Sequence, residues 1–163
     1  MNRISSPSRL ATLSLLAATL LASAAAWADG SPVGLWKSID DATGKPKALI
    51  RISENNGELS GKIEKLFRAP EEDQNPVCQK CEGELKDKPV IGMTILSGLK
   101  KDGDEYNGGQ IIDPANGKVY KSKLTVVDDG QKLNVRGYVG MPMLGRTQTW
   151  PVSYTHLTLP TKA

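Results

Sequence analysis

Histidine and cysteine, which often supply the nucleophiles, bases and metal ligands of enzymes, are almost missing from this sequence. Its 163 residues include one histidine, His156, and two cysteines. A serine nucleophile needs a neighbouring base, and zinc sites draw their ligands mainly from Cys and His. The sequence also lacks a G-x-S-x-G elbow, a phosphate-binding loop and an H-E-x-x-H pair. We therefore expect no enzyme activity, no metal and no cofactor.

Clustered aromatic residues and an excess of basic charge, two features of nucleic-acid-binding surfaces, are also lacking. Phe, Trp and Tyr make up 5% of the chain. The formal charge of +3 comes from 21 Lys and Arg against 18 Asp and Glu, but Arg3, Arg9 and Lys162 lie near the two ends. Without those three, 18 basic residues balance the 18 acidic ones. No nucleic-acid partner is expected.

The N-terminal segment, residues 1–28, has the composition of a secretory signal peptide. Arg3 and Arg9 precede an apolar run, residues 10–21, and small residues follow, ending in Ala-Trp-Ala. The run is too short to span a bilayer stably, and the A-x-A pattern predicts cleavage before Asp29. We expect a periplasmic or secreted protein with no stable membrane span in its mature part. An uncleaved membrane anchor is the alternative.

The histidine lies in the C-terminal stretch VSYTHLTLPTKA, residues 152–163, which shows no clear strand or helix pattern. The run VSYTHLTLPT matches one translated frame of the transposon-end adapter used in preparing sequencing libraries. We interpret residues 151–163 as adapter read-through rather than native sequence, with Pro151 formed at the junction. A natural extension is the alternative. A terminus without burial is in either case a poor place for catalysis, so His156 receives no role.

Between residues 29 and 150, short extended runs alternate with turn signals, a pattern typical of an all-β barrel or sandwich. Helical periodicity is absent outside the N-terminal segment, so the sheet should be antiparallel. Gly61 predicts a bulge or bend in one strand, and Asn107–Gly109 predict a bend in another. The expected strands, about eight, are residues 33–39, 48–54, 58–67, 93–101, 105–113, 118–127, 132–140 and 145–150.

Several motifs in this region, among them SPVGLWKSIDDATGKPKALIRI, CQKCEGELKDKPVIGMTIL and DGDEYNGGQIIDPANGKVYK, resemble a known family in order and spacing. The family is the bacterial exported proteins of domain-of-unknown-function family 2147, and the resemblance covers essentially residues 31–150. It implies a single domain, residues 29–150, that forms an antiparallel lipocalin-like (calycin) barrel in the periplasm or outside the cell. It implies no established activity.

Gly34-Leu35-Trp36 resembles the G-x-W motif that opens the first strand of lipocalin barrels. By that resemblance Trp36 plugs one end of the barrel, and an arginine of the last strand, here Arg146, packs across it. Such a cation–π contact contributes roughly 0.5–2 kcal/mol. Gly34, Trp36 and Arg146 are therefore expected to close the barrel and not to form a binding site.

The interior of an eight-stranded barrel is filled by side chains or holds one small ligand. Apolar residues share one face of the expected strands, and a few polar groups would fix a ligand if they point inward. Alternation fixes which residues share a face but not the width of the space, so a solidly packed barrel is the alternative. The candidate ligand-binding residues are Ile50, Arg51, Ile52, Met93, Ile95, Tyr106, Leu124, Arg136 and Tyr138.

Cys78 and Cys81 form a C-x-x-C pair in the longest irregular stretch, residues 68–89. A zinc site would have to recruit carboxylates as its remaining ligands. A thioredoxin-like redox pair works from a helix N-terminus beside a βαβ unit, which an all-β pattern does not supply. We favour a structural disulfide that pins this loop in an oxidising compartment. Because the ring is small, the disulfide constrains the unfolded chain by only roughly 2 kcal/mol.

These observations favour an exported, non-catalytic protein that binds a small apolar or amphipathic ligand inside a β-barrel. The alternative is an envelope interaction or stress-related module that contacts another protein through the barrel surface and the Cys78/Cys81 loop. A thiol oxidoreductase is a third, weaker hypothesis. The expected partners are thus a small lipophilic ligand or an envelope protein.

Overall fold

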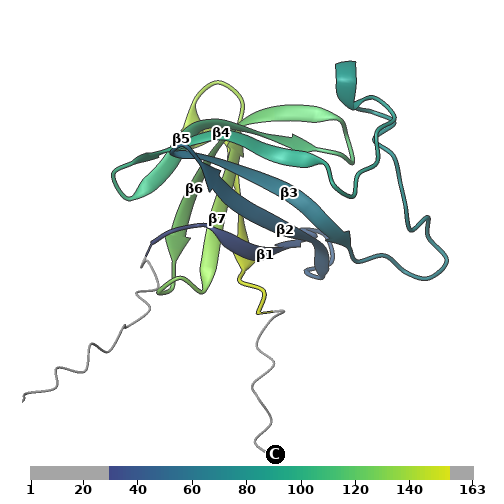
Figure 1. Cartoon of the computed structure of the whole chain (residues 1–163), viewed down its shortest axis with the longest axis horizontal. Helices are drawn as coiled ribbons and strands as arrows, with labels where there is room; N and C mark the ends of the chain where they lie inside the picture. Colours follow the sequence, from purple (N-terminus) through teal and green to yellow (C-terminus); the bar gives the residue numbers. More distant parts are fainter. Residues whose placement is uncertain (1–29, 155–163) are drawn as a thin grey trace, which may run out of the picture.

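Eight strands follow one another along the chain, and each pairs antiparallel with the next (Figure 1). The computed structural model describes residues 30–154, in which two single-turn 3₁₀ helices, η1 (Gly83–Leu85) and η2 (Pro142–Leu144), and no α-helix occur. The expected all-β antiparallel fold is confirmed. The strands are β1 (Gly34–Ile39), β2 (Pro46–Asn55), β3 (Glu58–Leu66), β4 (Thr94–Asp102), β5 (Glu105–Asp113), β6 (Lys118–Val127), β7 (Lys132–Tyr138) and β8 (Arg146–Pro151).

The first and last strands come together and nearly close the sheet into a barrel. Trp36 of β1 forms a β-bridge with Val152, which directly follows β8. At the other end of β8 the connection is made by side chains. Asp41, in the β1–β2 turn, pairs with Arg146 and accepts a hydrogen bond from the Gln148 amide. The seam between β1 and β8 is therefore joined by the backbone at one end and by polar side chains at the other.

The β1–β2 turn is held by the carboxylate of Asp40. Its Oδ1 atom accepts hydrogen bonds from the Ala42 N–H (3.1 Å), the Thr43 N–H (2.8 Å) and the Thr43 hydroxyl (2.9 Å). These bonds, led by the one from the Thr43 hydroxyl, hold the pKa of Asp40 below its ordinary value. The turn thereby places the adjacent Asp41 beside β8.

The barrel interior is apolar, as the two-residue alternation predicted. Trp36 and Trp150 are the largest buried side chains of the described residues, each 2% exposed. A buried indole N–H needs an acceptor. The Trp36 N–H donates to the Pro32 carbonyl at 2.8 Å, and the Trp150 N–H donates to the Gln148 side-chain oxygen at 3.0 Å. Both rings therefore pack into the core without leaving a polar atom unsatisfied.

Two glycine positions distort the sheet, as the sequence predicted. The pairing of β3 with β4 shifts register at Gly61, and that of β5 with β6 shifts between Tyr106 and Gly109. At Gly109 a β-carbon would lie 2.3 Å from the Ser97 carbonyl oxygen of β4. Only glycine allows two backbones to approach so closely, so this position sets the local path of β4 and β5.

The paired region continues past the expected domain boundary at residue 150. β8 includes Pro151, and the Ser153 N–H donates to the Leu35 carbonyl at 2.7 Å. Val152 also packs against the hydrophobic core, and Ser153 is buried. The predicted signal peptide and His156 lie outside the described residues. Within residues 30–154, no helix has the length and apolar character needed to cross a membrane.

Candidate functional site

A cavity of about 490 Å³ opens at one end of the barrel. Lining residues stand at alternate positions of β8, where they are Arg146, Gln148 and Trp150, whereas on β5 the adjacent residues Ile111 and Ile112 both line the cavity. Ile50 of β2 and Val135 of β7 line the cavity, whereas Ile52, two residues after Ile50, and Leu133, two residues before Val135, do not. The hollow therefore starts at the mouth and ends within the barrel. Its other apolar lining residues include Ala48, Ile63, Leu66, Val90 and Ile95.

The rest of the interior is packed with side chains. Leucines fill much of this region, and five of them are 0% exposed: Leu59, Leu96, Leu99, Leu124 and Leu133. The sequence left open whether the barrel is hollow or solid. The structure combines the two, with a packed base that stabilises the fold and an open half that leaves room for a ligand.

The mouth of the cavity is polar and mainly cationic. Lys47, Arg68 and Arg146 line it, and the carboxylate among the lining residues is that of Asp113. Arg146 also pairs with Asp41, and its side chain remains 68% exposed. Solvent thus reaches the charged groups at the rim, while the cavity wall below them is apolar.

The β5–β6 turn forms one side of the mouth. Asp113 Oδ1 accepts a hydrogen bond from the Ala115 N–H at 2.9 Å, and Asp113 Oδ2 accepts one from the Asn116 amide at 3.0 Å. The Asn116 amide also donates to the Tyr120 hydroxyl at 3.3 Å. The Asp113 carboxylate therefore holds the turn together. Two of the three cations at the mouth are also paired, Arg68 with Glu72 at 3.5 Å and Arg146 with Asp41.

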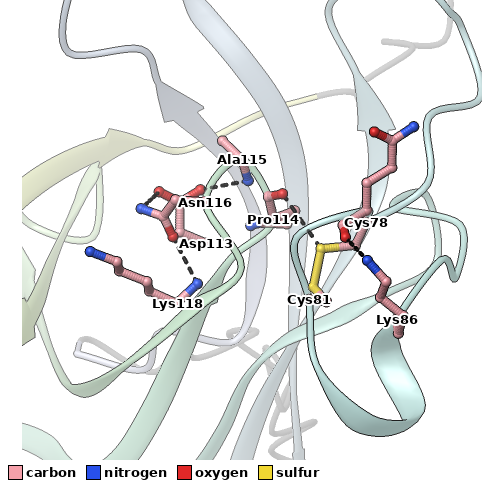
Figure 2. Close-up of a disulfide and its surroundings, with 9 residues drawn as sticks. Cys78, Cys81, Lys86, Asp113, Pro114, Ala115, Asn116 and Lys118 are labelled. Atoms are coloured by element: carbon pink, nitrogen blue, oxygen red, sulfur yellow. Dashed lines mark hydrogen bonds between the residues drawn. A yellow bond between two sulfur atoms is a disulfide. The ribbon is translucent and has the colours of Figure 1, made fainter.

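The segment with both cysteines, here called the cysteine loop (residues 76–90), lies against this turn (Figure 2). Pro76 and Val90 of the loop line the cavity. Main-chain hydrogen bonds join the two arms of the loop, from the Cys78 N–H to the Lys88 carbonyl (2.8 Å) and from the Val90 N–H to the Pro76 carbonyl (2.9 Å). The loop is thus an ordered wall of the cavity.

The cysteine loop and the β5–β6 turn are in close contact. Cys78 Sγ lies 3.5 Å from the Pro114 carbonyl oxygen (Figure 2). At Gly117, where φ is +73°, a β-carbon would lie 1.8 Å from the Lys80 carbonyl oxygen. A larger residue at position 117 would have to push the loop away, so this glycine fixes the distance between the two segments.

The predicted disulfide between Cys78 and Cys81 is confirmed, with an S–S distance of 2.03 Å. Cys78 is 0% exposed and Cys81 is 3% exposed, and both belong to the hydrophobic core cluster. Zinc binding needs thiolates, and thiol exchange needs an accessible sulfur. Because the two cysteines are bonded to each other and buried, they stabilise the loop that forms one wall of the cavity.

The predicted ligand-binding residues separate into three groups. Ile50 and Ile95 line the cavity. A second group is buried in the core but does not line the cavity. Alternation correctly predicted that these side chains are internal, but it carries no information on their depth in the barrel. This second group consists of Ile52, Met93, Tyr106 and Leu124.

The third group lies on the outside of the barrel, so its members do not meet the condition, an inward-pointing side chain, under which the sequence made them ligand-binding candidates. Arg51 pairs with Glu64 on the outer face at 2.6 Å, and this hydrogen bond raises the pKa of Arg51 above its ordinary value. Arg136 and Tyr138 flank Gly137, which lines the cavity. Successive strand residues point to opposite faces, and at each of these positions the apolar or small neighbour takes the inside.

The lipocalin resemblance implied that Arg146 packs across Trp36, but the structure places these two residues apart. Trp36 bridges Val152, six residues after Arg146. Since a strand rises about 3.3 Å per residue, this offset places Arg146 roughly 20 Å along β8 from the bridge. There it pairs with Asp41 at the mouth. Gly34 and Trp36 do open β1, and the Trp36 ring is buried.

Sequence reasoning missed several residues of the mouth and cavity wall, among them Lys47, Arg68, Gln148 and Trp150. On the last strand, Arg146, Gln148 and Trp150 occupy alternate positions. This alternation could have indicated that Gln148 and Trp150 face the same side as Arg146. Lys47 and Arg68 lie near strand ends, where alternation gives no indication of what a side chain faces.

A nearly closed antiparallel barrel with a cavity at one end is a lipocalin-like fold. The fold is similar to a solved structure titled "Protein HP1028 from the human pathogen Helicobacter pylori belongs to the lipocalin family". The TM-score is 0.64 at 19% sequence identity, and the match covers 77% of this chain and 84% of that chain.

The chain belongs to the family described as "Uncharacterized protein conserved in bacteria (DUF2147)", whose model matches residues 34–151. The family and the lipocalin-like fold expected from the sequence motifs are therefore confirmed. No curated protein matches the chain.

Proposed function

We propose that this protein is an exported, non-catalytic carrier that holds one small amphipathic molecule in the barrel cavity. The cavity itself is the observation that supports the proposal. Its volume of about 490 Å³ lies within the roughly 300–1,000 Å³ typical of small-molecule sites. Such sites are mostly apolar and carry a few placed polar groups, as this one does.

The distribution of polarity favours an amphipathic ligand over a purely apolar one. Ile50, Val135 and Trp150 supply an apolar interior, where a hydrocarbon or aromatic body would be removed from water. Lys47 and Arg146 lie at the rim, where a polar head group would remain solvated and would meet positive charge. The ligand would therefore enter with its apolar end first.

A cavity-filling substitution tests this carrier function. Gly137 lines the cavity, and a β-carbon there would make ordinary contacts with Ile111 (3.5 Å) and Tyr120 (3.6 Å). Gly137→Phe should therefore fold and place its ring in the cavity. We expect saturable binding of the probe dansyl-undecanoic acid to the unmodified protein, seen as energy transfer from tryptophan to dansyl. The variant should bind the probe at least about tenfold more weakly, because its ring occupies apolar space the probe needs.

Val119→Phe is the matched control, because Val119 is 53% exposed on a neighbouring strand. It adds the same ring outside the cavity and should leave probe binding unchanged. Absence of saturable binding to the unmodified protein, or equal binding by Gly137→Phe, would contradict the proposal.

Export is the second part of the proposal. Residues 1–28 have the sequence features of a signal peptide, and the Cys78–Cys81 disulfide supports an oxidising compartment. Intact-mass measurement and N-terminal sequencing of protein recovered from the periplasmic fraction should show a chain that begins at Asp29. Recovery only from the cytoplasm, with residues 1–28 still attached, would refute export.

A further inference from the structure

The connection between β7 and β8 exposes a group of apolar side chains, here called the apolar loop (residues 139–144). Val139 is 71% exposed, Met141 59%, Met143 75% and Leu144 76%. Figure 1 shows this connection projecting as a loop beyond the strands at the top of the view. Single exposed apolar residues are ordinary on a protein surface, but a contiguous group indicates an interaction site.

The apolar loop is held in shape by hydrogen bonds from Arg136. Its Nε donates to the Pro142 carbonyl at 2.7 Å, its Nη2 to the Met143 carbonyl at 3.2 Å and its Nη1 to the Thr147 hydroxyl at 2.7 Å. At the base of the loop, a β-carbon at Gly145 would lie 2.5 Å from the Gly137 carbonyl oxygen. These contacts hold the loop against the strands, so its side chains are displayed by a fixed backbone.

The charge at the base of the apolar loop is positive on balance, since one carboxylate, Asp41, pairs there with Arg146 while other cations in the described part of the chain stay without an acidic partner. No Asp or Glu occurs after Asp129 in the sequence. Among the described residues, Arg136 makes no ion pair, so its charge is not neutralised by a carboxylate. Lys121 of β6 lies opposite Tyr138, the last residue of β7, in the strand register, and it is also exposed. A protruding apolar tip with cations at its base is complementary to a surface that is apolar inside and anionic outside.

We propose that the apolar loop inserts into the interface of a lipid bilayer containing anionic lipids and docks the protein there peripherally. A bilayer accepts a few apolar side chains flanked by cations, with no need for a shaped partner surface. A stable protein interface usually engages about 20–30 residues on each side, far more than this loop offers. The loop joins Gly137 to Arg146, both of which line the cavity, so docking brings the mouth of the barrel close to the membrane.

This docking goes beyond the carrier function and does not require an occupied cavity. Cosedimentation with vesicles tests it, using phosphatidylcholine vesicles with and without phosphatidylglycerol. We expect the unmodified protein to bind the anionic vesicles, and less strongly as salt is added. The double variant Met143→Ser/Leu144→Ser keeps the charge and should bind about tenfold or more weakly, because two apolar side chains no longer enter the interface.

Val33→Ser/Val119→Ser is the matched control, since these valines are 48% and 53% exposed elsewhere on the barrel. This control should bind vesicles as the unmodified protein does. The proposal is overturned if the unmodified protein stays in the supernatant with anionic vesicles, or if Met143→Ser/Leu144→Ser binds them equally well. Either result would leave a protein partner as the occupant to seek.

A second readout reports insertion directly. Leu144→Trp places a fluorophore at a position that is 76% exposed, so it should not disturb the fold. Its emission should shift to the blue and be quenched by brominated lipids when anionic vesicles are added; an unchanged spectrum would argue against insertion. Dansyl-undecanoic acid binding by Met143→Ser/Leu144→Ser should remain unchanged, which separates failure of membrane docking from failure of the carrier function.

Discussion

Gly117 occupies a position where any other residue would displace the backbone of the cysteine loop. Its φ of +73° lies in the left-handed region, and its missing side chain admits the Lys80 carbonyl oxygen. Gly130, in the β6–β7 connection, has a similar φ of +85° but no heavy atom within 4 Å of the β-carbon position. The two glycines therefore separate the cost of backbone strain from the cost of steric overlap.

Gly117→Ala should destabilise the protein more than Gly130→Ala. Both changes impose left-handed strain on alanine, which costs about 1–2 kcal/mol. Gly117→Ala adds a steric overlap of the kind that typically costs about 1–3 kcal/mol. Urea unfolding should therefore show a larger loss for Gly117→Ala, and hydrogen exchange should speed up at the Cys78 and Val90 amides, which bridge the loop. Equal losses for the two variants would show that the close contact does not position the loop.

Strands and hairpins are the elements that the sequence predicted best. Apart from β3 and β4, which residues 67–93 separate, consecutive strands are joined by short connections, so most of the information that specifies the pairing is local. Alternation in β2 and β7 and the turn at Asn56–Gly57, with φ values of 52° and 77°, are examples. The bulge at Gly61 was predictable for the same reason, because glycine in a strand interior weakens regular pairing.

Elements that meet over long sequence distances were predicted less well. The expected contact between Arg146 and Trp36 depends on the register between the first and last strands, which no local pattern encodes. The contact of the cysteine loop with the β5–β6 turn is of the same kind. C-x-x-C spacing indicated a disulfide, but the place of the loop at the cavity mouth depends on Gly117 and on main-chain bonds.

The site was predicted only in part. The alternation of apolar and polar residues shows which face of a strand a side chain occupies, but not how deep in the barrel it lies. Ile50 and Ile52 follow the same inward pattern, yet only Ile50 lines the cavity. Polar residues such as Arg51 were candidates because of their chemistry, while their outward position followed from the apolar residues beside them. The mouth cations Lys47 and Arg68 became visible only once the strands were assembled.

The molecule as a whole has one closed and one open end. Leu124 and Leu133 belong to the fully buried base, while the mouth is bounded by the cysteine loop and the β5–β6 turn. The apolar loop adjoins the same open half, since its two ends continue into residues that line the cavity. This arrangement is consistent with a carrier that takes up an amphipathic ligand through a mouth held near a lipid surface.

Native mass spectrometry of the purified protein is the most direct test of the central claim, that the cavity holds a single amphipathic ligand. After incubation with dansyl-undecanoic acid, the spectrum should show one equivalent bound to the unmodified protein and none, or very little, bound to Gly137→Phe. An unmodified protein that stays free of any adduct, or one that binds several equivalents which Gly137→Phe binds equally, would contradict the account.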